Sequence, residues 1–353
     1  MSAARYELLQ TNLRTGEVVA RLPATGISYT ETLNQAGAAT FGIPLNAPQA
    51  DPSKLVAGGS GLVVVRDSEP VWGGILWSLA ADLAAGTLSL GASGYHSHYK
   101  GRHFVDGFDG EEWDIADLLR AWLYRLNAVN TDLSALTPTG RTRTRRWSKD
   151  ELKNVADAIT EMSDNIGGFN FRYESFWADR GKVVGNRFKI SDRSGSATMH
   201  YLTHRVDCDI RSVTYDSTPL ATAAYAVGAD NGAGEKLVGI ATNSELAQRI
   251  PTKQMVATYS DVKETENLLL KAQATVNAGR APVAIPTLNL YPGARPQDYL
   301  PGDVCTVTAD SGYVSLNSEF ILTERKTDVD TTGRETIGLA LANRELFSNA
   351  IPS

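Results

Sequence analysis

Hydrophobic residues in the first hundred positions form short runs, and turn residues such as Gly, Pro, Asn and Asp separate them. Such runs are typical of β-strands joined by tight turns. A turn at Thr15-Gly16 predicts that the first two strands form a hairpin. The predicted strands cover residues 5–11, 17–22, 27–33, 38–43, 61–66, 71–77 and 87–91. Short strands at this spacing indicate a small barrel or sandwich.

A helical pattern replaces the strand pattern after Gly94. Apolar residues recur every three or four positions from Trp113 to Leu126, which predicts an amphipathic helix. We expect a group of acidic residues to lie at the start of this helix, where the helix dipole favours negative charge. These residues are Asp109, Glu111, Glu112 and Asp114.

A second helix is predicted to begin at Ser148, where Glu151 completes a capping box. Its apolar stripe extends from Leu152 to Ile166, and Gly167-Gly168 ends it. Alternating aromatic residues then predict a strand, and two more strands are expected as its partners. The three strands cover residues 169–173, 182–190 and 198–202. This part of the chain is therefore expected to be an α+β unit.

Strand patterns return from His204 onward, interrupted by one predicted helix. That helix runs from Asp261 to Asn277, with Asp261 and Glu264 at its cap and Gly279 after its end. The strands cover residues 206–215, 223–228, 284–290, 304–307, 319–326 and 336–342, with a hairpin turn over 330–333. The predicted fold class is mainly β with an α+β insertion. We expect three domains: a β-barrel over 1–94, a smaller α+β domain over 95–204 and a second β-barrel over 205–353.

An internal similarity links the two β parts. Gly61-Leu-Val-Val-Val65, a turn and Trp72-Gly-Gly-Ile-Leu76 resemble Gly302-Asp-Val-Cys-Thr-Val307, a turn and Phe320-Ile-Leu-Thr-Glu324. Each is a strand, a turn and a strand near the end of its part. The pattern predicts two related barrels.

Composition and charge narrow the class of protein. Hydrophobic residues make up 42% of the 353 residues and charged residues 21%, which indicates a globular chain rather than a disordered one. The net charge of -6 argues against a protein that holds DNA by neutralising its phosphates. The sequence shows no signal peptide and no apolar stretch long enough to span a membrane, so we expect no membrane insertion by this chain.

The chemistry-bearing residues fit no standard metal or cofactor site. Cys208 and Cys305 are far apart, which excludes a disulfide framework or a zinc ribbon and predicts two buried core residues. His96-Ser-His98 would place two imidazoles on one face of a strand, with His103, Asp106 and Asp109 close behind. Their spacing matches no zinc pattern. We therefore expect no metal and no cofactor.

No catalytic motif is present either. Gly91-Ala-Ser-Gly94 is too short for a nucleophile elbow, and the sequence has neither a Walker loop nor a Rossmann fingerprint. The acidic pairs Glu111-Glu112 and Asp150-Glu151 lie at predicted helix starts, where the dipole explains them. We expect no catalytic residues and no enzyme, although the separation of a glycosidase carboxylate pair is a tertiary property that sequence does not fix.

One segment is densely basic. Alternation would place Arg141, Arg143 and Arg145 on one side of an extended strand. These arginines are candidates for an interface with an acidic neighbour, which could be a second copy of the chain. The alternative is a solvated loop before the capped helix. Stacking aromatic residues do not accompany them, so nucleic-acid binding is disfavoured.

The chain resembles the minor tail proteins of long-tailed phages, in particular the baseplate hub family that includes the N-terminal module of tail-associated lysins. Three groups of segments carry the resemblance, and their order along the chain fits the family. They are residues 5–9 with 26–34 and 39–44, residues 62–67 with 71–76, and residues 299–304 with 320–324.

The resemblance implies a structural protein at the tip of the phage tail, made in the host cytoplasm. Proteins of this family form a homotrimeric ring in which each subunit contributes two tube-like β-barrels. The implied partners are the distal tail or tail tube protein, the tape measure protein and other tail tip or fibre proteins. DNA would pass through the ring without specific binding. Because the sequence stops at Ser353, we expect any lysin or fibre to be a separate chain.

Two other functions stay open. One is a cell-surface glycan-binding tail module that uses Trp72, Trp77 or Trp177 as a stacking platform. The other is a cell-wall hydrolase.

Overall fold

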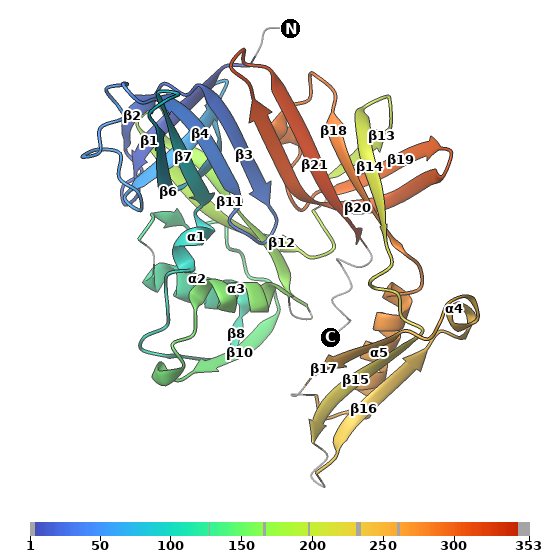
Figure 1. Cartoon of the computed structure of the whole chain (residues 1–353). Helices are drawn as coiled ribbons and strands as arrows, with labels where there is room; N and C mark the ends of the chain where they lie inside the picture. Colours follow the sequence, from blue (N-terminus) through green and yellow to red (C-terminus); the bar gives the residue numbers. More distant parts are fainter. Residues whose placement is uncertain are drawn as a thin grey trace.

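The computed structural model describes residues 4–126, 128–164, 167–196, 198–230, 234–259 and 262–344. Most of them lie in β-strands, and the predicted mainly β fold with an α+β insertion is confirmed. One 13-stranded sheet dominates the molecule, and three small sheets accompany it. The path of the large sheet runs from β14 to β2 and stays open among the described residues, so no closed barrel forms there (Figure 1).

The first β part supplies seven antiparallel strands in the spatial order β3-β4-β7-β6-β5-β1-β2. They are β1 (Tyr6–Asn12), β2 (Val18–Leu22), β3 (Gly26–Thr32), β4 (Ala38–Pro44), β5 (Ser60–Arg66), β6 (Glu69–Asp82) and β7 (Thr87–Gly94). Alternate residues point to opposite faces of a strand, so one apolar face is buried. Its core contains Leu8, Tyr29, Phe41, Leu62 and Trp72.

The second β part supplies six strands. They are β13 (Met199–Thr203), β14 (Cys208–Asp216), β18 (Val283–Leu290), β19 (Val304–Ser311), β20 (Val314–Val329) and β21 (Glu335–Asn343). The expected pairing of strand 198–202 with the aromatic strand 169–173 is wrong, because β13 lies parallel to β19. Cys208 and Cys305 are free and buried in the core of this part, as predicted.

The α+β part lies below the first β part in Figure 1. Its elements are α1 (His96–Tyr99), β8 (Phe108–Asp114), α2 (Ile115–Arg125), β9 (Thr131–Asp132), β10 (Thr142–Trp147), the 3-10 turn η1 (Lys149–Glu151), α3 (Val155–Asp164), β11 (Phe169–Asp179) and β12 (Val183–Asp192). Helices α2 and α3 bury their apolar stripes against the aromatic faces of β11 and β12, with Trp122, Phe169 and Phe188 fully buried.

Three local predictions in this part need correction. Asp109, Glu111 and Glu112 lie on strand β8, and only Asp114 caps helix α2, by accepting a hydrogen bond from the Ala116 N–H. The capping box at Ser148 is present, but it starts only the turn η1. The chain then leaves helical geometry at Leu152, whose φ is 44°, so α3 begins later, at Val155.

A small unit interrupts the second β part. It consists of β15 (Ala223–Asp230), β16 (Lys236–Thr242), α4 (Ser244–Arg249), β17 (Gln254–Thr258) and α5 (Thr265–Ala278). The three strands form their own sheet, and α5 packs on it through Leu268, Ala272 and Val276. The sequence predicted α5 but not α4, and the expected cap residue Asp261 lies outside the described residues. The chain then returns through the 3-10 turn η2 (Pro296–Asp298) to β19.

The two β parts repeat one strand arrangement, as the internal similarity predicts. The order β5-β6-β7-β4-β3 in the first part matches β19-β20-β21-β18-β14 in the second. The long strands β6 and β20 both carry a bulge at the same place, between Leu76 and Ser78 and between Leu322 and Glu324. A bulge bends its strand and increases the local twist. Before its bulge, β6 pairs with β5 and β20 pairs with β19. After the bulge, each long strand extends beyond that neighbour.

The two β parts are joined edge to edge, because β20 pairs with β3 after its bulge. The ladder runs from Glu324 opposite Thr32 to Val329 opposite Ile27. Near its Glu324 end the fully buried Arg325 donates to the Glu31 carboxylate at 2.6 Å. Arg325 also donates to the backbone carbonyls of Pro296 and Tyr299, so it ties the η2 segment to the joint.

A second polar contact spans the same joint. The Arg66 guanidinium on β5 binds both oxygens of Glu335 on β21, at 2.5 and 3.1 Å, and the Tyr6 hydroxyl donates to the same carboxylate at 2.6 Å. Arg66 is itself buried. Two-point guanidinium–carboxylate contacts fix orientation as well as distance, so this pair sets the angle between the two β parts.

Removing the buried cation at the joint should destabilise the whole chain. We expect Arg325→Ala to lower the free energy of unfolding by about 3–5 kcal/mol, because Glu31 and two carbonyls lose their buried partner. Lys326→Ala is the matched control. Lys326 is the next residue on β20 and forms an exposed ion pair with Asp328 at 3.1 Å, so its loss should cost less than about 1 kcal/mol. Urea unfolding of the two variants measures the difference, and equal losses would contradict the role given to Arg325.

Candidate assembly surfaces

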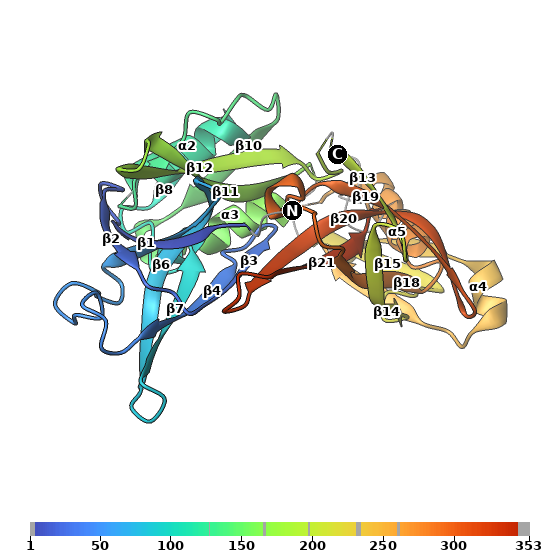
Figure 2. The same cartoon turned by 90° about the horizontal axis from the view of Figure 1, so that it is seen from above.

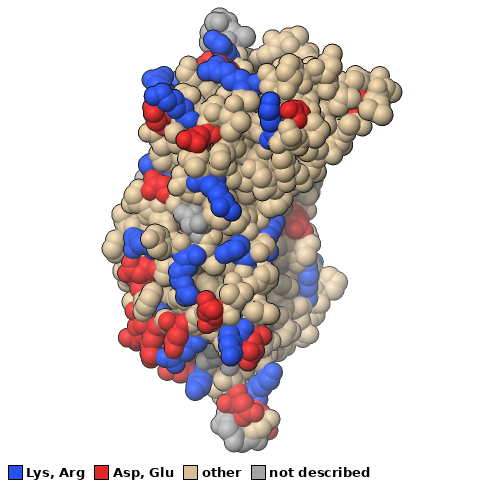
Figure 3. Space-filling model, turned by 90° about the vertical axis from the view of Figure 1, so that its left-hand side faces the viewer, with Lys and Arg blue, Asp and Glu red and all other residues tan. Residues whose placement is uncertain are grey.

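The predicted basic strand exists as β10, and its side chains alternate as expected. Arg141, Arg143 and Arg145 are half-buried, whereas Thr142 and Thr144 between them are exposed. The strand pairs antiparallel with β8 and lies beside its acidic residues. On the face shown in Figure 3, positive and negative side chains are interspersed rather than gathered into one basic patch.

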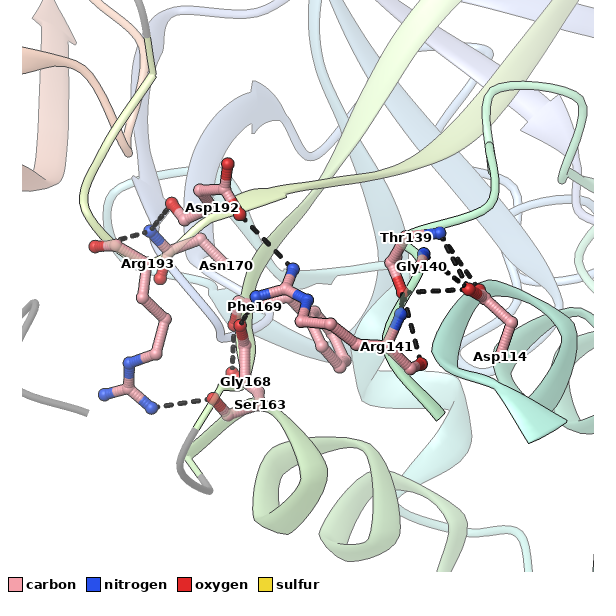
Figure 4. Close-up of polar contacts among 10 residues, drawn as sticks. All are labelled: Asp114, Thr139, Gly140, Arg141, Ser163, Gly168, Phe169, Asn170, Asp192 and Arg193. Atoms are coloured by element: carbon pink, nitrogen blue, oxygen red, sulfur yellow. Dashed lines mark hydrogen bonds and ion pairs between the residues drawn. The ribbon is translucent and has the colours of Figure 1, made fainter. Parts of the chain in front are cut away.

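Arg141 is held inside the α+β part. Its guanidinium donates to the Gly168 carbonyl at 3.1 Å and lies 3.3 Å from the Asp192 carboxylate (Figure 4). Next to it, the Asp114 carboxylate accepts hydrogen bonds from the backbone of Thr139 and Gly140, which fixes the loop that leads into β10. Arg141 therefore fastens β10 to the ends of β11 and β12.

Arg143 and Arg145 are also engaged within the chain. Each donates to the carbonyl of the residue before it, at 2.7 and 2.9 Å. Burial, together with the charge of Arg141, lowers the pKa of Arg143. The next arginine, Arg146, pairs with Asp109 at 2.8 Å and with Glu111. The use of the three predicted arginines at an interface stays a prediction, and the contacts described here stabilise the α+β part.

The structure corrects the placement of the histidine pair. His96 and His98 lie on the short helix α1 rather than on the predicted strand. His96 is buried, with its ring 4.9 Å from that of Phe171, and burial lowers its pKa to about 4. Across the described ranges of the chain, no three His, Cys, Asp or Glu side chains gather where they could hold a metal ion.

Ser196, His200 and Asp303 come together although the sequence did not single them out as a set. The Ser196 hydroxyl donates to one oxygen of Asp303 at 2.7 Å, and the His200 Nε2 lies 3.0 Å from the other. In a catalytic triad the histidine contacts the serine and accepts its proton. Here both contact the aspartate, so the arrangement holds the Ser196 loop and β13 against the start of β19.

The tryptophans proposed as a glycan platform are not grouped. Trp72 is buried in the first core, with 3% of its surface exposed. Trp177 is half-buried and donates to the Ser68 carbonyl at 2.8 Å. Of these three side chains only that of Trp77 is exposed, and it lies at the β6 bulge. The sequence therefore provides one exposed ring here rather than a stacking groove.

The exposed stretch after the β6 bulge is the surface that sequence reasoning missed. β6 was predicted to end at Trp77, but it continues to Asp82. Every residue from Trp77 to Asp82 is exposed, although only Asp82 is charged. An exposed apolar strand edge is a template for pairing with another strand. The signal that could have revealed it is the continuation of uncharged residues through Leu79-Ala-Ala81 up to the turn.

Comparison with known proteins identifies the fold. No protein-family model matches the sequence, and no curated protein matches it. A tail protein from Neisseria meningitidis MC58 is similar in structure, with a TM-score of 0.64 and 13% identity, over 99% of this chain and 99% of that one. The 43 kDa tail protein of prophage MuSo2 from Shewanella oneidensis gives 0.63 and 11%, over 98% and 100%. The chain has the fold of phage tail proteins.

The same fold recurs in one further complex. A chain of the Francisella PdpA–VgrG complex matches with a TM-score of 0.57 and 9% identity, over 99% of this chain and 59% of that one. The tail-protein fold therefore extends over nearly the whole length of the present chain. The resemblance predicted from the sequence is confirmed at the level of the fold. Among the residues that the structure describes, no helix is long and apolar enough to cross a membrane.

The buried His96 predicts a specific loss of stability in acid. Its folded pKa of about 4 lies below the ordinary value of 6.5, so between these values the unfolded chain binds more protons than the folded one. Stability is therefore complete above about pH 6.5 and falls by about 3 kcal/mol as the pH drops to 4. His96→Phe should flatten this part of the profile, whereas His103→Gln, at an exposed position, should leave it unchanged. Urea unfolding at a series of pH values measures both, and an unaltered slope in His96→Phe would contradict the assignment.

Proposed function

We propose that this chain is a structural hub subunit of a phage tail tip and that three copies form a ring around the DNA channel. The observation that carries the proposal is the internal repeat, because one chain holds two equivalent β units joined edge to edge by the β20–β3 ladder. The similarity to tail proteins over nearly the whole chain supports the same function. No catalytic turnover is part of this function.

The repeat explains how a trimer would meet six-fold neighbours. Three chains with two β units each would present six similar units around one axis. Such a ring suits the hexameric face of a tail tube or distal tail protein on one side. The tape measure protein and other tail tip or fibre proteins would then contact the ring from the channel and from the far side.

The charge of the chain suits a conduit. The net charge of -6 repels phosphate over several ångströms, so DNA would pass through the ring without adhering to it. Part of the positive charge at β10 is balanced within the chain, because Arg141 faces the Asp192 carboxylate and Arg146 faces Asp109 and Glu111. Arg141, Arg143 and Arg145 remain candidates for contact with an acidic neighbouring protein of the tail tip.

The proposal predicts a defined oligomer and a defined location. Native mass spectrometry of the purified chain should detect a species of three times 38.0 kDa. Antibodies against the chain should label one end of the tail in purified phage particles. A protein that stays monomeric and is absent from the particles would contradict the proposal.

A further inference from the structure

The exposed half of β6 has one free edge. After its bulge β6 pairs with β7, from Ser78 opposite Gly91 to Asp82 opposite Thr87. On its other side the pairing of β6 with β5 ends at Ile75, which lies opposite Gly61, before the bulge. The structure pairs no described strand with this second edge of residues 78–82. Natural edge strands are protected by charge or proline, and residues 77–81 contain neither.

The outer edge of β14 is the second free edge. β14 ends the path of the large sheet and pairs only with β18 among the described strands. Tyr215 on this strand is 38% exposed, and its ring contacts the ring of Tyr313, which is 90% exposed. An apolar surface therefore lies beside an open set of backbone hydrogen-bonding groups.

The internal repeat shows what these two edges fit. In the repeat, β6 corresponds to β20 and β14 corresponds to β3. Within one chain, β20 and β3 already pair after the bulge and bury that half of β20. The equivalent half of β6 is bare, and the equivalent of β3 is β14. The strand that would complete β6 is therefore a copy of β14.

The two edges cannot meet within one chain. Strands β7, β4, β3, β20, β21 and β18 lie between β6 and β14 in the large sheet. Figure 2 shows β6 and β14 on opposite sides of the molecule. A contact between them must therefore join two copies head to tail, and head-to-tail contacts close into rings when the rotation between subunits permits.

We propose that residues 78–82 of β6 pair antiparallel with residues 212–216 of β14 in a neighbouring copy, so that one continuous sheet runs around the ring. This interface rests on the proposed ring function and specifies how its copies are joined. It repeats between chains the joint that β20 and β3 make within each chain.

The repeat also fixes the register. Ser78 faces Gly91 just after its bulge as Glu324 faces Ala340, so Ser78 takes the place of Glu324. On the other strand Ser212 faces Thr287 as Ser28 faces Thr40. Carrying the β20–β3 ladder over places Ser78 opposite Asp216, Ala80 opposite Thr214 and Asp82 opposite Ser212 of the neighbouring copy.

The same register gives the two joints different chemistry. The place of the buried Arg325–Glu31 pair is taken by Leu79 opposite Tyr215, both 38% exposed in the single chain. Burial of this apolar pair would stabilise the contact between copies. Leu79 cannot pair with the Glu31 carboxylate, and Tyr215 cannot balance the buried charge of Arg325. β20 therefore selects β3 as its partner, and β6 selects β14.

Paired cysteines test both the contact and its register. In oxidised protein, Ala80→Cys/Thr214→Cys should form disulfide-linked dimers and trimers on a non-reducing gel, because directly opposite residues on paired strands fall within disulfide reach. Ala81→Cys/Thr214→Cys is the matched control, since Ala81 points to the other face of β6 and should not link. The unaltered chain, whose own cysteines are buried, should stay unlinked.

The outcomes separate this interface from the proposed function. The gel is run both on purified protein and on phage particles that carry the variants. Linked oligomers only in Ala80→Cys/Thr214→Cys support the interface. If the chain forms a trimer or enters particles and this variant does not link, or the control links equally, the interface is overturned while the ring function stands. Absence of both trimers and incorporation overturns the two together.

A charge on the free edge provides an independent measurement. Leu79→Lys should raise the dissociation constant of the ring by about tenfold or more, because the added charge would be buried at the place of Arg325, opposite Tyr215 and without a carboxylate partner. Tyr124→Lys, at an exposed position on α2, should leave it unchanged. Circular dichroism of both monomers checks that they fold, and a ring unaffected by Leu79→Lys would overturn the proposal.

Discussion

The pairing of β20 with three other strands is the constraint on which the rest of the structure depends. β20 pairs with β19 before its bulge, with β21 along most of its length and with β3 after the bulge. β19 and β3 use the same hydrogen-bonding edge of β20, the first before the bulge and the second after it. The bulge at Leu322/Glu324 turns the strand between these two partners and so converts two β units into one sheet.

The charged residues at this joint contribute orientation more than free energy. The attraction within a buried ion pair offsets little more than the cost of removing its two groups from water. Such a pair is nevertheless costly to break, and it forms in few geometries. Burial raises the pKa of Glu31, and the Arg325 guanidinium opposes that rise. The Arg66–Glu335 contact adds a second fixed point at the other end of the joint. The proposed ring alternates the first and second β parts around its axis. Such a ring would require that the two β parts of each chain are held at a set angle.

Much of this architecture could be predicted from the sequence, and the failures have identifiable physical causes. Short apolar runs located the strands of the first part, and the similarity between residues 61–76 and 302–324 indicated the repeat. The helix start at Ser148 failed because a correct capping signal was followed by Leu152 in a left-handed conformation. His96 was placed on a strand because alternation over three residues cannot be told from one helical turn. The burial of Arg325 depends on Glu31, 294 residues away, and no local pattern reports such a partner. The free edge of β6 was missed because a strand that lacks its partner shows no burial pattern.

In the proposed ring, two kinds of joint, one within each chain and one between chains, would bring six β units together from three copies. An electron cryomicroscopy map of the assembled ring, at a resolution that separates strands, tests it most directly. We expect three chains, six β units around the axis and unbroken sheet density from β6 of each copy into β14 of the next. A ring in which the copies meet through other surfaces, with the 78–82 edge of β6 open to solvent, would contradict it.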